Sequence, residues 1–496
     1  MKNSLTIKLT GDTPQPAQTG EATAVLIFED EPRTSSPHND DEKLVVERLL
    51  RDGEFKGEED TSLFLHEASE RGARRLLLVG LGAHRDFDAA VFSRAVGIAV
   101  RRARDANVKE LRLHLPQGGD PARMARAAAE GATLGLYDND FYQKQTEAKH
   151  TLERLTIIAD DVSEKLKKEI ERGRIIAESV NWTRTLADEP GATLPPLEFA
   201  RRAALMAEEF GLRVESLLTT DEIRARGMGG LWGVGCGSDE PPALIVIRYE
   251  PEGVTQDDEL WAFVGKGITF DTGGISIKHG LDMYEMKTDM AGGAAALGAL
   301  RAIAQLKSKR RVVAIVPSAE NMPSGRSIKP GDIVKTLAGY TIEVVDTDAE
   351  GRLVLSDGIA YAKQLGASRI VDLATLTGSI IVALGSQRAG LFSNNDEWAA
   401  RVLRASESAG EPTWRMPVSD DYKKKIESDI ADFKNYGGRP DAIAAALLLS
   451  KFAGETPWVH LDIAGTSWND DALPSAPKGS TGAGVRTLVE LVCGEV

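Results

Sequence analysis

The chain has 496 residues, of which 42% are hydrophobic and 27% charged, with a formal net charge of −15. This length exceeds what one ordinary hydrophobic core accommodates, so we expect a soluble protein of two or more domains. The acidic balance argues against nucleic acid or anionic membranes as partners, because both repel a negatively charged surface. Two cysteines, Cys236 and Cys493, exclude a disulfide scaffold and a four-cysteine zinc site.

The N-terminal third alternates strand-like and helix-like segments. Buried strands are expected at 24–28, 76–80 and 111–115, and amphipathic helices at 88–106 and 121–136. This alternation predicts a small α/β domain with a largely parallel sheet. The first residues lack an apolar segment of signal-peptide length, and no run approaches a membrane span, so we expect a cytoplasmic protein.

A long helix is expected over 160–188, and a Pro-Gly pair ends it. We place the domain boundary on this helix. The predicted organisation is an N-terminal α/β domain over 1–160, a linker helix over 161–190 and a larger C-terminal domain over 191–496.

Beyond the linker helix the alternation of strands and helices returns. The expected strands cover 242–249, 260–264, 311–316 and 369–373, and the expected helices cover 291–306 and 357–365. The polar motifs of this part fall at strand ends or just before helices. Ligand sites of open α/β sheets lie at the carboxyl ends of strands, so we expect a site there.

The stretch 346–357 reads D-T-D-A-E-G-R-L-V-L-S-D. Asp348 and Glu350 lie two apart, so on an extended segment both side chains leave the same face. Gly351 allows a close backbone approach, and Arg352 adds a planar cation that suits an anion. Two acids aimed at one point repel each other unless a cation lies between them, which favours a divalent metal.

A second stretch, 261–293, carries Lys266, Asp271, Lys278 and Asp289 among glycines and apolar residues. Unpaired charges are costly in such surroundings. One interpretation is a set of structural ion pairs, such as Lys266 with Asp271. That interpretation leaves the density of glycines unexplained, and glycines suit a backbone close to a ligand.

Together the two stretches resemble the leucyl aminopeptidase (cytosol aminopeptidase) family of two-metal exopeptidases. The family signature N-T-D-A-E-G-R-L appears as D-T-D-A-E-G-R-L. Further matches, in family order, are V-G-K-G-I-T-F-D-T-G-G-I-S-I-K at 264–278, M-K-T-D-M-A-G at 286–292, A-T-L-T-G at 374–378, H-L-D-I-A-G at 460–465 and T-G-A-G-V-R at 481–486. The resemblance implies two α/β domains, the larger C-terminal one catalytic, with a central mixed sheet flanked by helices.

The resemblance also implies the activity. It predicts a metal-dependent aminopeptidase that removes N-terminal residues, preferring leucine-like side chains, by a two-metal bridging-water mechanism. The implied metal ligands are Lys266, Asp271, Asp289, Asp348 and Glu350. Carboxylates suit Mn²⁺ or Mg²⁺, and the lysine nitrogen also suits Zn²⁺, so the identity of the metals stays open.

The other implied roles concern the substrate. Lys278 resembles a family lysine that is no ligand but stabilises the developing oxyanion. Arg352 resembles the arginine that holds bicarbonate, thought to act as general base. The implied substrate-binding residues are Met286, Thr375, Leu376 and Gly378. The resemblance implies peptides with a free N-terminus as substrates and a homohexamer as the assembly.

Three positions depart from the family pattern. Asp346 replaces the asparagine of the signature. In the segment that matches N-x-G-G-R-x-x-G-A-x-T-A-A, Asp441 replaces a small residue and Ala444 replaces a hydroxyl. This segment flanks the substrate pocket in the family, so the side-chain preference stays open.

Other classes have less support from the sequence. A serine hydrolase would carry G-x-S-x-G and a single-zinc protease H-E-x-x-H, and neither motif occurs. A phosphate loop would place Ser or Thr after Lys266, where Gly267 stands. A non-catalytic binding protein on this fold is the alternative from another class. Retention of all five implied ligand positions favours the enzyme.

Overall fold

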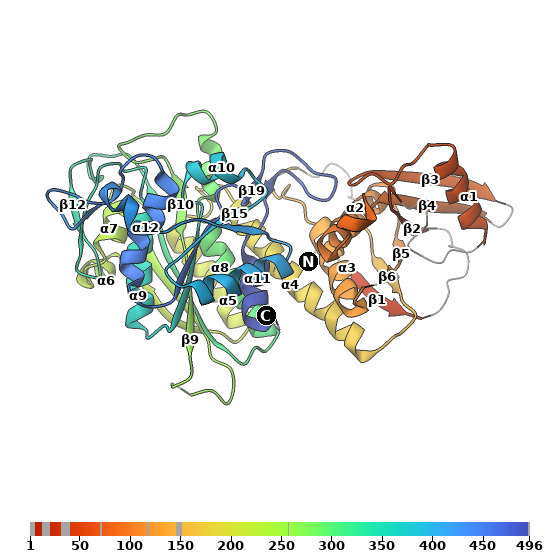
Figure 1. The fold of residues 1–496 in the computed structure, drawn as a ribbon, viewed down its shortest axis with the longest axis horizontal. Coiled ribbons are helices and arrows are strands. Elements are labelled where there is room, and N and C mark those ends of the chain that lie inside the picture. The colour runs from red at the N-terminus through yellow and green to blue at the C-terminus, as the bar shows by residue number, and fades with distance from the viewer. Residues whose placement is uncertain are drawn as a thin grey trace. The chain divides into compact units, whose positions relative to one another are not determined.

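The structure is a computed structural model that describes residues 5–11, 20–30, 40–69, 72–116, 119–144, 151–255 and 257–494. The chain divides into two compact units, Met1–Glu178 with Asp470–Lys478 and Ser179–Asn469 with Gly479–Val496 (Figure 1). The division falls within helix α4 (Glu164–Asp188), which begins four residues later than expected. The domain bounds drawn from the sequence stay a prediction.

The first unit contains a six-stranded sheet in the order β1-β6-β5-β2-β4-β3. Its strands are β1 (Thr6–Thr10), β2 (Glu21–Ile27), β3 (Ser62–Ser69), β4 (Gly72–Gly80), β5 (Glu110–His114) and β6 (Arg154–Ile158). All neighbours are parallel except β3, which runs antiparallel to β4. The expectation of a largely parallel sheet is therefore confirmed.

Helices cover both faces of this sheet. Successive side chains of a strand point to opposite faces, so alternate residues of one strand pack against different helices. Ala24 and Leu26 of β2 pack in a core with α2 (Ala89–Asp105) and α3 (Pro121–Gly135). Val25 and Ile27 pack in a second core with α1 (Asp40–Arg51). The continuous apolar run in β2 reflects burial on both faces.

The second unit is built on a nine-stranded sheet in the order β16-β15-β18-β14-β9-β11-β8-β7, with β10 beside β11. The central strands β18, β14, β9 and β11 are parallel, whereas β15, β8 and β7 run antiparallel to a neighbour, so the sheet is mixed. The strands are β7 (Arg213–Leu218), β8 (Ala243–Tyr249), β9 (Leu260–Gly265), β10 (Gly267–Asp271), β11 (Arg311–Asn321), β14 (Arg369–Ala374), β15 (Ala389–Ser393), β16 (Thr413–Arg415) and β18 (Trp458–Asp462).

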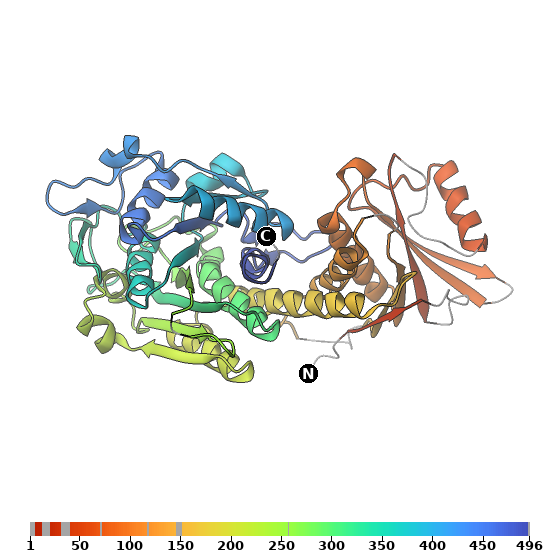
Figure 2. The same cartoon turned by 60° about the horizontal axis from the view of Figure 1, so that its bottom comes forward.

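Helices flank this sheet, as expected (Figure 2). α8 packs against α13 and the central strands, and α9 packs against α12. The helices are α5 (Pro196–Glu209), α6 (Thr220–Ala225), α7 (Gly229–Gly235), α8 (Ala291–Gln305), α9 (Gly351–Gln364), α10 (Gly378–Leu384), α11 (Asp396–Ser408), α12 (Asp441–Ala453) and α13 (Val485–Cys493). Short strands β12 (Ile333–Lys335), β13 (Thr341–Glu343) and β17 (Phe433–Lys434) form a small sheet, and β19 (Trp468–Asn469) pairs with β20 (Gly479–Ser480).

Two local expectations were wrong around the acidic motif. The segment 346–350 is not extended: Oδ1 of Asp346 accepts the Asp348 N–H at 2.9 Å, which makes a turn. Helix α9 begins at Gly351 rather than at 357. Leu353 is fully buried in the core of this unit, so packing outweighs the weak helix propensity of glycine.

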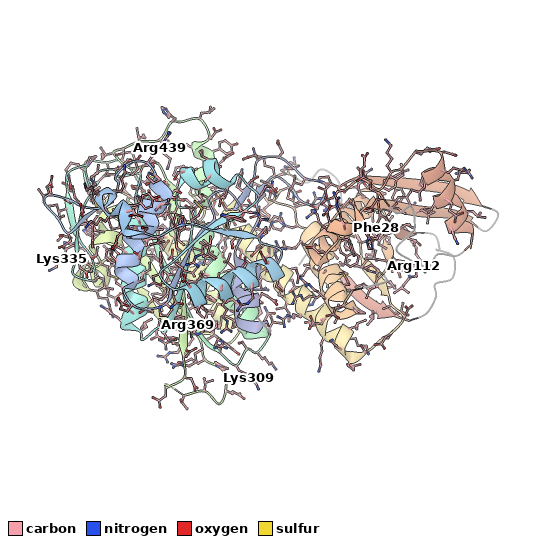
Figure 3. The ribbon with its side chains drawn as sticks, viewed as in Figure 1. Phe28, Arg112, Lys309, Lys335, Arg369 and Arg439 are labelled. Atoms are coloured by element: carbon pink, nitrogen blue, oxygen red, sulfur yellow. The ribbon has the colours of Figure 1, made fainter. Side chains whose placement is uncertain are left out.

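The carboxyl ends of the parallel strands mark one end of the second unit. Arg369 begins β14 and therefore marks the amino end of the parallel strands. In Figure 3, Arg439, two residues before α12, lies at the opposite end of the unit.

Among the helices of the described residues, none is long and apolar enough to cross a membrane.

Candidate metal centre

The polar residues of the two motifs meet at the carboxyl edge of the sheet. Lys266 follows β9, Asp271 ends β10 and Thr375 follows β14. Asp289 lies two residues before α8, and Glu350 directly precedes α9. Parallel strands place their carboxyl ends at one edge, so segments distant in sequence converge there.

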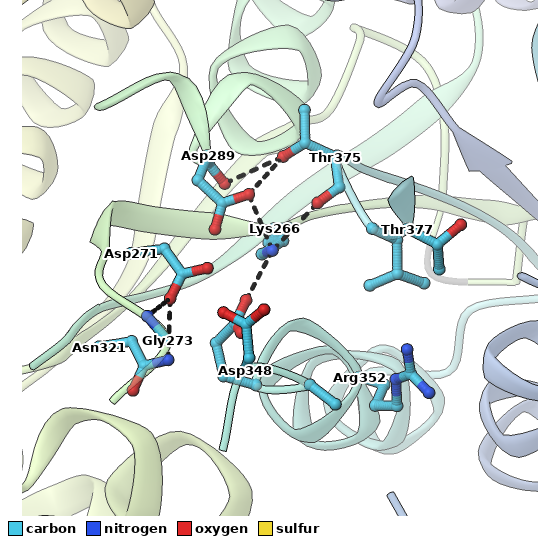
Figure 4. A network of polar contacts seen from close by, with 12 residues as sticks. Lys266, Asp271, Gly273, Asp289, Asn321, Asp348, Arg352, Thr375 and Thr377 are labelled. Atoms are coloured by element: carbon cyan, nitrogen blue, oxygen red, sulfur yellow. Dashed lines mark hydrogen bonds and ion pairs between the residues drawn. The ribbon is translucent and has the colours of Figure 1, made fainter. Parts of the chain in front are cut away.

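The ammonium group of Lys266 lies at the centre of the site (Figure 4). Its Nζ is 2.8 Å from Oδ1 of Asp289 and 2.7 Å from Oε1 of Glu350, and it donates to the Thr375 carbonyl at 3.0 Å. The side chain is 4% exposed. Its ion-pair partners are therefore Asp289 and Glu350, and not Asp271 as the structural interpretation of the sequence had it.

Lys278 joins two other carboxylates of the same site. Its Nζ lies 2.9 Å from Oδ2 of Asp271 and 2.5 Å from Oδ1 of Asp348. Asp271 is buried, whereas the Asp348 side chain is 35% exposed. The structure thus brings all five expected metal ligands together with Lys278.

Two glycines allow this close packing. A Cβ at Gly351 would lie 2.9 Å from Nζ of Lys266, so a larger residue there would displace the lysine side chain from its place between the carboxylates. Gly273 has φ +85°, and a Cβ there would lie 2.7 Å from Oδ1 of Asp348. Gly273 of the second motif therefore lets the backbone pass close to a charged side chain, whereas Gly265 of the same motif lets β9 approach the backbone of α8, where a Cβ would lie 2.4 Å from the Gly292 carbonyl oxygen.

Asn321 orients the carboxylates, a role that sequence reasoning missed. Its Nδ2 donates to Oδ1 of Asp271 at 2.8 Å and to the Thr347 carbonyl at 3.0 Å. The same Oδ1 accepts the Gly273 N–H at 2.9 Å. Asn321 therefore ties the end of β10 to the turn that carries Asp348. The available signal was a polar side chain at the end of a fully buried strand.

Burial makes the negative charge of this site costly. It raises the pKa of Glu350 to about 8, with the charge of Asp271 acting in the same direction. Burial also raises the pKa of Asp289 to about 6, against the opposing effect of Lys266. For Lys266 and Lys278, burial acts to lower the pKa, but the surrounding carboxylates outweigh it and raise both pKa values.

The donor set fits divalent cations. Asp271, Asp348 and Glu350 each offer a carboxylate oxygen, and these oxygens lie within 4.8 Å of one another. Oδ2 of Asp289 and Oε2 of Glu350 are buried and have no hydrogen-bond partner among the described residues. Buried carboxylate oxygens without a partner are costly, and hard cations such as Mn²⁺ and Mg²⁺ prefer them as ligands.

The expected substrate loop borders the same site. The Thr375 hydroxyl donates to Oδ1 of Asp289 at 2.7 Å. Asp462, which sequence reasoning had not given a role, holds the rest of the loop: its Oδ1 accepts the Leu376 N–H at 3.2 Å and its Oδ2 accepts the Thr377 hydroxyl at 2.6 Å. Gly378 is exposed and begins α10.

Met286 and Arg352 adjoin the cluster in sequence but, like Leu376 and Gly378, are not joined to its carboxylates by any described hydrogen bond or ion pair. Met286 is half-buried in the short helical turn Met283–Thr288, directly before Asp289. Arg352 is buried in the first turn of α9, and its partners are Asn435 and Asp441. The polar contacts of Arg352 are therefore with the segment that leads into α12, and not with the carboxylate cluster.

Comparison with protein-family models identifies the family of the chain. The model described as the cytosol aminopeptidase family, catalytic domain, matches residues 181–489, and the family's N-terminal domain matches 24–146. The chain is 49% identical over 452 residues to a probable cytosol aminopeptidase of Solibacter usitatus, covering 91% of this chain and 93% of the relative. A relative of the same description from Acidobacterium capsulatum is 46% identical, with coverage of 90% and 89%.

Solved structures agree with this result. A mutant of tomato leucine aminopeptidase matches with a TM-score of 0.88 and 31% identity, covering 99% of this chain and 96% of that chain. The bottromycin maturation enzyme BotP, solved in complex with Mn, matches with a TM-score of 0.83 and 35% identity, covering 95% and 98%. The chain belongs to the cytosol aminopeptidase family. It is accordingly a metal-dependent aminopeptidase built from two α/β domains.

Proposed function

We propose that this aminopeptidase holds two divalent metal ions per subunit and releases N-terminal residues, preferring leucine-like side chains, from peptides. The observation that carries this proposal is the buried carboxylate cluster with two unpartnered oxygens, on Asp289 and Glu350. The proposed ligands are the carboxylates of Asp271, Asp289, Asp348 and Glu350 and the amine of Lys266, which can bind a metal only after it has lost its proton to the effect of the nearby cations. When bound, divalent cations polarise a peptide carbonyl and activate water for attack.

The chain's own residues supply the rest of the chemistry. Lys278 keeps its proton because Asp271 and Asp348 surround it, so its ammonium can stabilise the oxygen of the peptide carbonyl as negative charge develops. The anion held by Arg352 is proposed as the proton acceptor, and the family resemblance implies bicarbonate for it. The backbone of the loop that contains Thr375, Leu376 and Gly378 is proposed to align the substrate.

The proposed metals would favour an exopeptidase. A substrate's free α-amino group is a nitrogen donor that could fill a coordination position on a bound metal, like the amine of Lys266, which lies within 3 Å of the carboxylate oxygens of Asp289 and Glu350. An acylated nitrogen has lost its basicity and binds a metal poorly. An enzyme that relies on a free α-amino group rejects peptides with a blocked N-terminus and does not cleave internal peptide bonds, because the position of the amino group is then left unfilled.

The decisive experiment compares leucine p-nitroanilide with its N-acetylated form. The protein is dialysed against a chelator, and Mn²⁺, Zn²⁺ or Mg²⁺ is added back. Metal-dependent cleavage of the free-amine substrate alone is the expected result. A folded protein that cleaves neither substrate with any metal contradicts the proposal and favours a binding protein on the same fold.

The preference for a particular substrate side chain requires a comparison of its own. Met286 and Leu376, both half-buried, are apolar and support a pocket for leucine-like side chains. A series of p-nitroanilides with leucine, methionine, alanine, lysine and glutamate tests this preference. The highest kcat/KM is expected for leucine or methionine, and a higher value for lysine or glutamate would contradict it.

We also propose a homohexamer with a cytoplasmic location. The family resemblance supports the hexamer, and the names of the relatives, probable cytosol aminopeptidases, support the location. Light scattering at micromolar concentration should give six times the subunit mass. A monomer under these conditions would overturn the assembly while leaving the proposed chemistry untouched.

A further inference from the structure

Arg352 already holds an anion that belongs to the chain. Its Nη1 lies 3.0 Å from Oδ1 of Asp441, and its Nη2 lies 3.3 Å from Oδ2. Two parallel contacts of this kind form a forked pair, the geometry in which guanidinium binds a carboxylate most strongly. The Arg352 side chain is 3% exposed and that of Asp441 is 18% exposed. The pair is therefore built into the protein interior.

The fork occupies one defined edge of the guanidinium. Nη1 also donates to the Asn435 carbonyl at 2.7 Å, so the terminal nitrogens of Arg352 are both engaged. Nε is buried and has no acceptor among the described residues. Arg352 thus has a terminal edge filled by Asp441 and a side edge that the described residues leave without an acceptor.

The segment that contains Asp441 also clamps the acidic turn. Oδ1 of Asn435 accepts the Val345 N–H at 2.8 Å, and its Nδ2 donates to the Asp346 carbonyl at 2.6 Å. Asp441 fixes Arg352 in the first turn of α9. Together the two contacts hold the turn with Asp348 on one side and the helix start after Glu350 on the other.

We propose that Asp441 supplies, from within the chain, the anion that Arg352 holds, so that turnover does not depend on bicarbonate from solution. Asp441 is then a positioning residue: its carboxylate neutralises Arg352 and fixes α9 where it meets the carboxylate cluster. This inference rests on the proposed function in assigning Arg352 to the site. It replaces bicarbonate as the anion of Arg352, so the proton acceptor proposed above is no ion from solution, and it leaves the metal requirement of the hydrolysis as proposed.

The test titrates bicarbonate against three variants. Asp441→Asn keeps the shape without the charge, Asp441→Ala opens the anion position, and Asp441→Glu restores a carboxylate. Asp420→Ala is the matched control, because Asp420 is 82% exposed and pairs at 3.6 Å with Lys451 of α12, the helix that begins at Asp441. Buffers are freed of carbon dioxide, and sodium chloride replaces bicarbonate in the reference series at constant pH.

Two readouts are measured, and the first needs no activity. In the metal-free protein, bicarbonate should raise the Tm of Asp441→Ala while leaving the wild type and Asp420→Ala unchanged, because a ligand stabilises only a protein with a site for it. With metal bound, the wild-type rate should not change with bicarbonate. Asp441→Ala should be about tenfold slower or more without it and recover on its addition. Asp441→Glu should behave more like the wild type than Asp441→Asn does.

The outcomes separate the inference from the proposed function. A wild type that gains Tm or rate with bicarbonate shows that Arg352 takes its anion from solution, through the Nε edge, and overturns the inference. An Asp441→Ala variant indifferent to bicarbonate in both readouts overturns it as well. A wild type without peptidase activity contradicts the proposed function, and the Tm series then still decides the role of Asp441.

Discussion

Nζ of Lys266 and Oε1 of Glu350 lie 2.7 Å apart in surroundings from which almost all water is excluded. Taking two charges out of water costs about as much as their attraction returns, so a buried pair of this kind adds little net stability. Four carboxylates around two ammonium groups also leave an excess of negative charge. The arrangement is better explained by a cation that binds there than by a need for stability.

Neutralising a carboxylate of the cluster should remove metal. Glu350→Gln and Asp271→Asn keep the shape of each side chain and delete one charged ligand. Both variants are expected to lose bound metal and turnover together. Metal content by mass spectrometry, beside hydrolysis of leucine p-nitroanilide, checks this, with Asp420→Ala as the control. Full metal content in both variants would show that these side chains are no ligands.

Removing the ammonium of Lys278 should separate metal binding from catalysis. Lys278→Ala leaves the five proposed ligands in place, so metal content should stay near that of the wild type. Turnover should fall by about 10²- to 10³-fold, the usual effect of losing one donor to a developing oxyanion. A kcat close to that of the wild type would show that Lys278 has no electrophilic role.

The sequence predicted the parts of this protein that depend on repeating patterns. Buried apolar runs such as 76–80 and 260–264 became strands, and 88–106 became a helix within a residue or two of its bounds. The strands and the helix follow from local periodicity. The grouping of Lys266, Asp271 and Glu350 in one site was implied by the resemblance to the family motifs, and it agrees with the rule that sites lie at strand ends.

What the sequence did not reveal depends on contacts between distant segments. Asn321 and Asp462 each hold a loop of the site through side-chain hydrogen bonds. Nothing in their sequence neighbourhoods shows which backbone they reach. The start of α9 at Gly351 depends on burial of Leu353 against the core, which outweighs local propensity. The forked pair of Arg352 with Asp441 joins residues 89 apart, and only the fold brings them together.

Asp462 should control substrate binding. Its carboxylate anchors Leu376 and Thr377, and it lies outside the carboxylate cluster. Asp462→Asn keeps the volume but weakens the contacts to this loop. KM should rise by about tenfold, since one hydrogen bond to a charged group is worth about 1.5–3 kcal/mol, while metal content stays unchanged. An unchanged KM together with lost metal would assign Asp462 to the metal centre instead.

His114 should make the first unit sensitive to acid. Burial lowers its pKa, although the charge of Asp160 acts to raise it. Because the folded pKa lies below the unfolded value of about 6.5, the unfolded chain binds more protons as the pH falls below that value, and stability is lost there. His114→Gln cannot take up this proton. The loss in urea midpoint between about pH 7 and about pH 5 should be smaller in His114→Gln than in the wild type. Equal losses in both would show that His114 does not titrate in this way.

Metal should stabilise the second unit as well as activate it. Oδ2 of Asp289 and Oε2 of Glu350 gain a partner only if a ligand binds, because the described residues provide none. A ligand at 100 times its Kd adds about 2.7 kcal/mol to the free energy of unfolding. Chelation should therefore lower the Tm of the wild type, and Mn²⁺ should restore it. Glu350→Gln, with one ligand neutralised, should show a smaller shift between the chelated and the loaded state. If chelator and Mn²⁺ left the Tm of the wild type unchanged while activity followed the metal, the cation would bind weakly and outside this buried cluster.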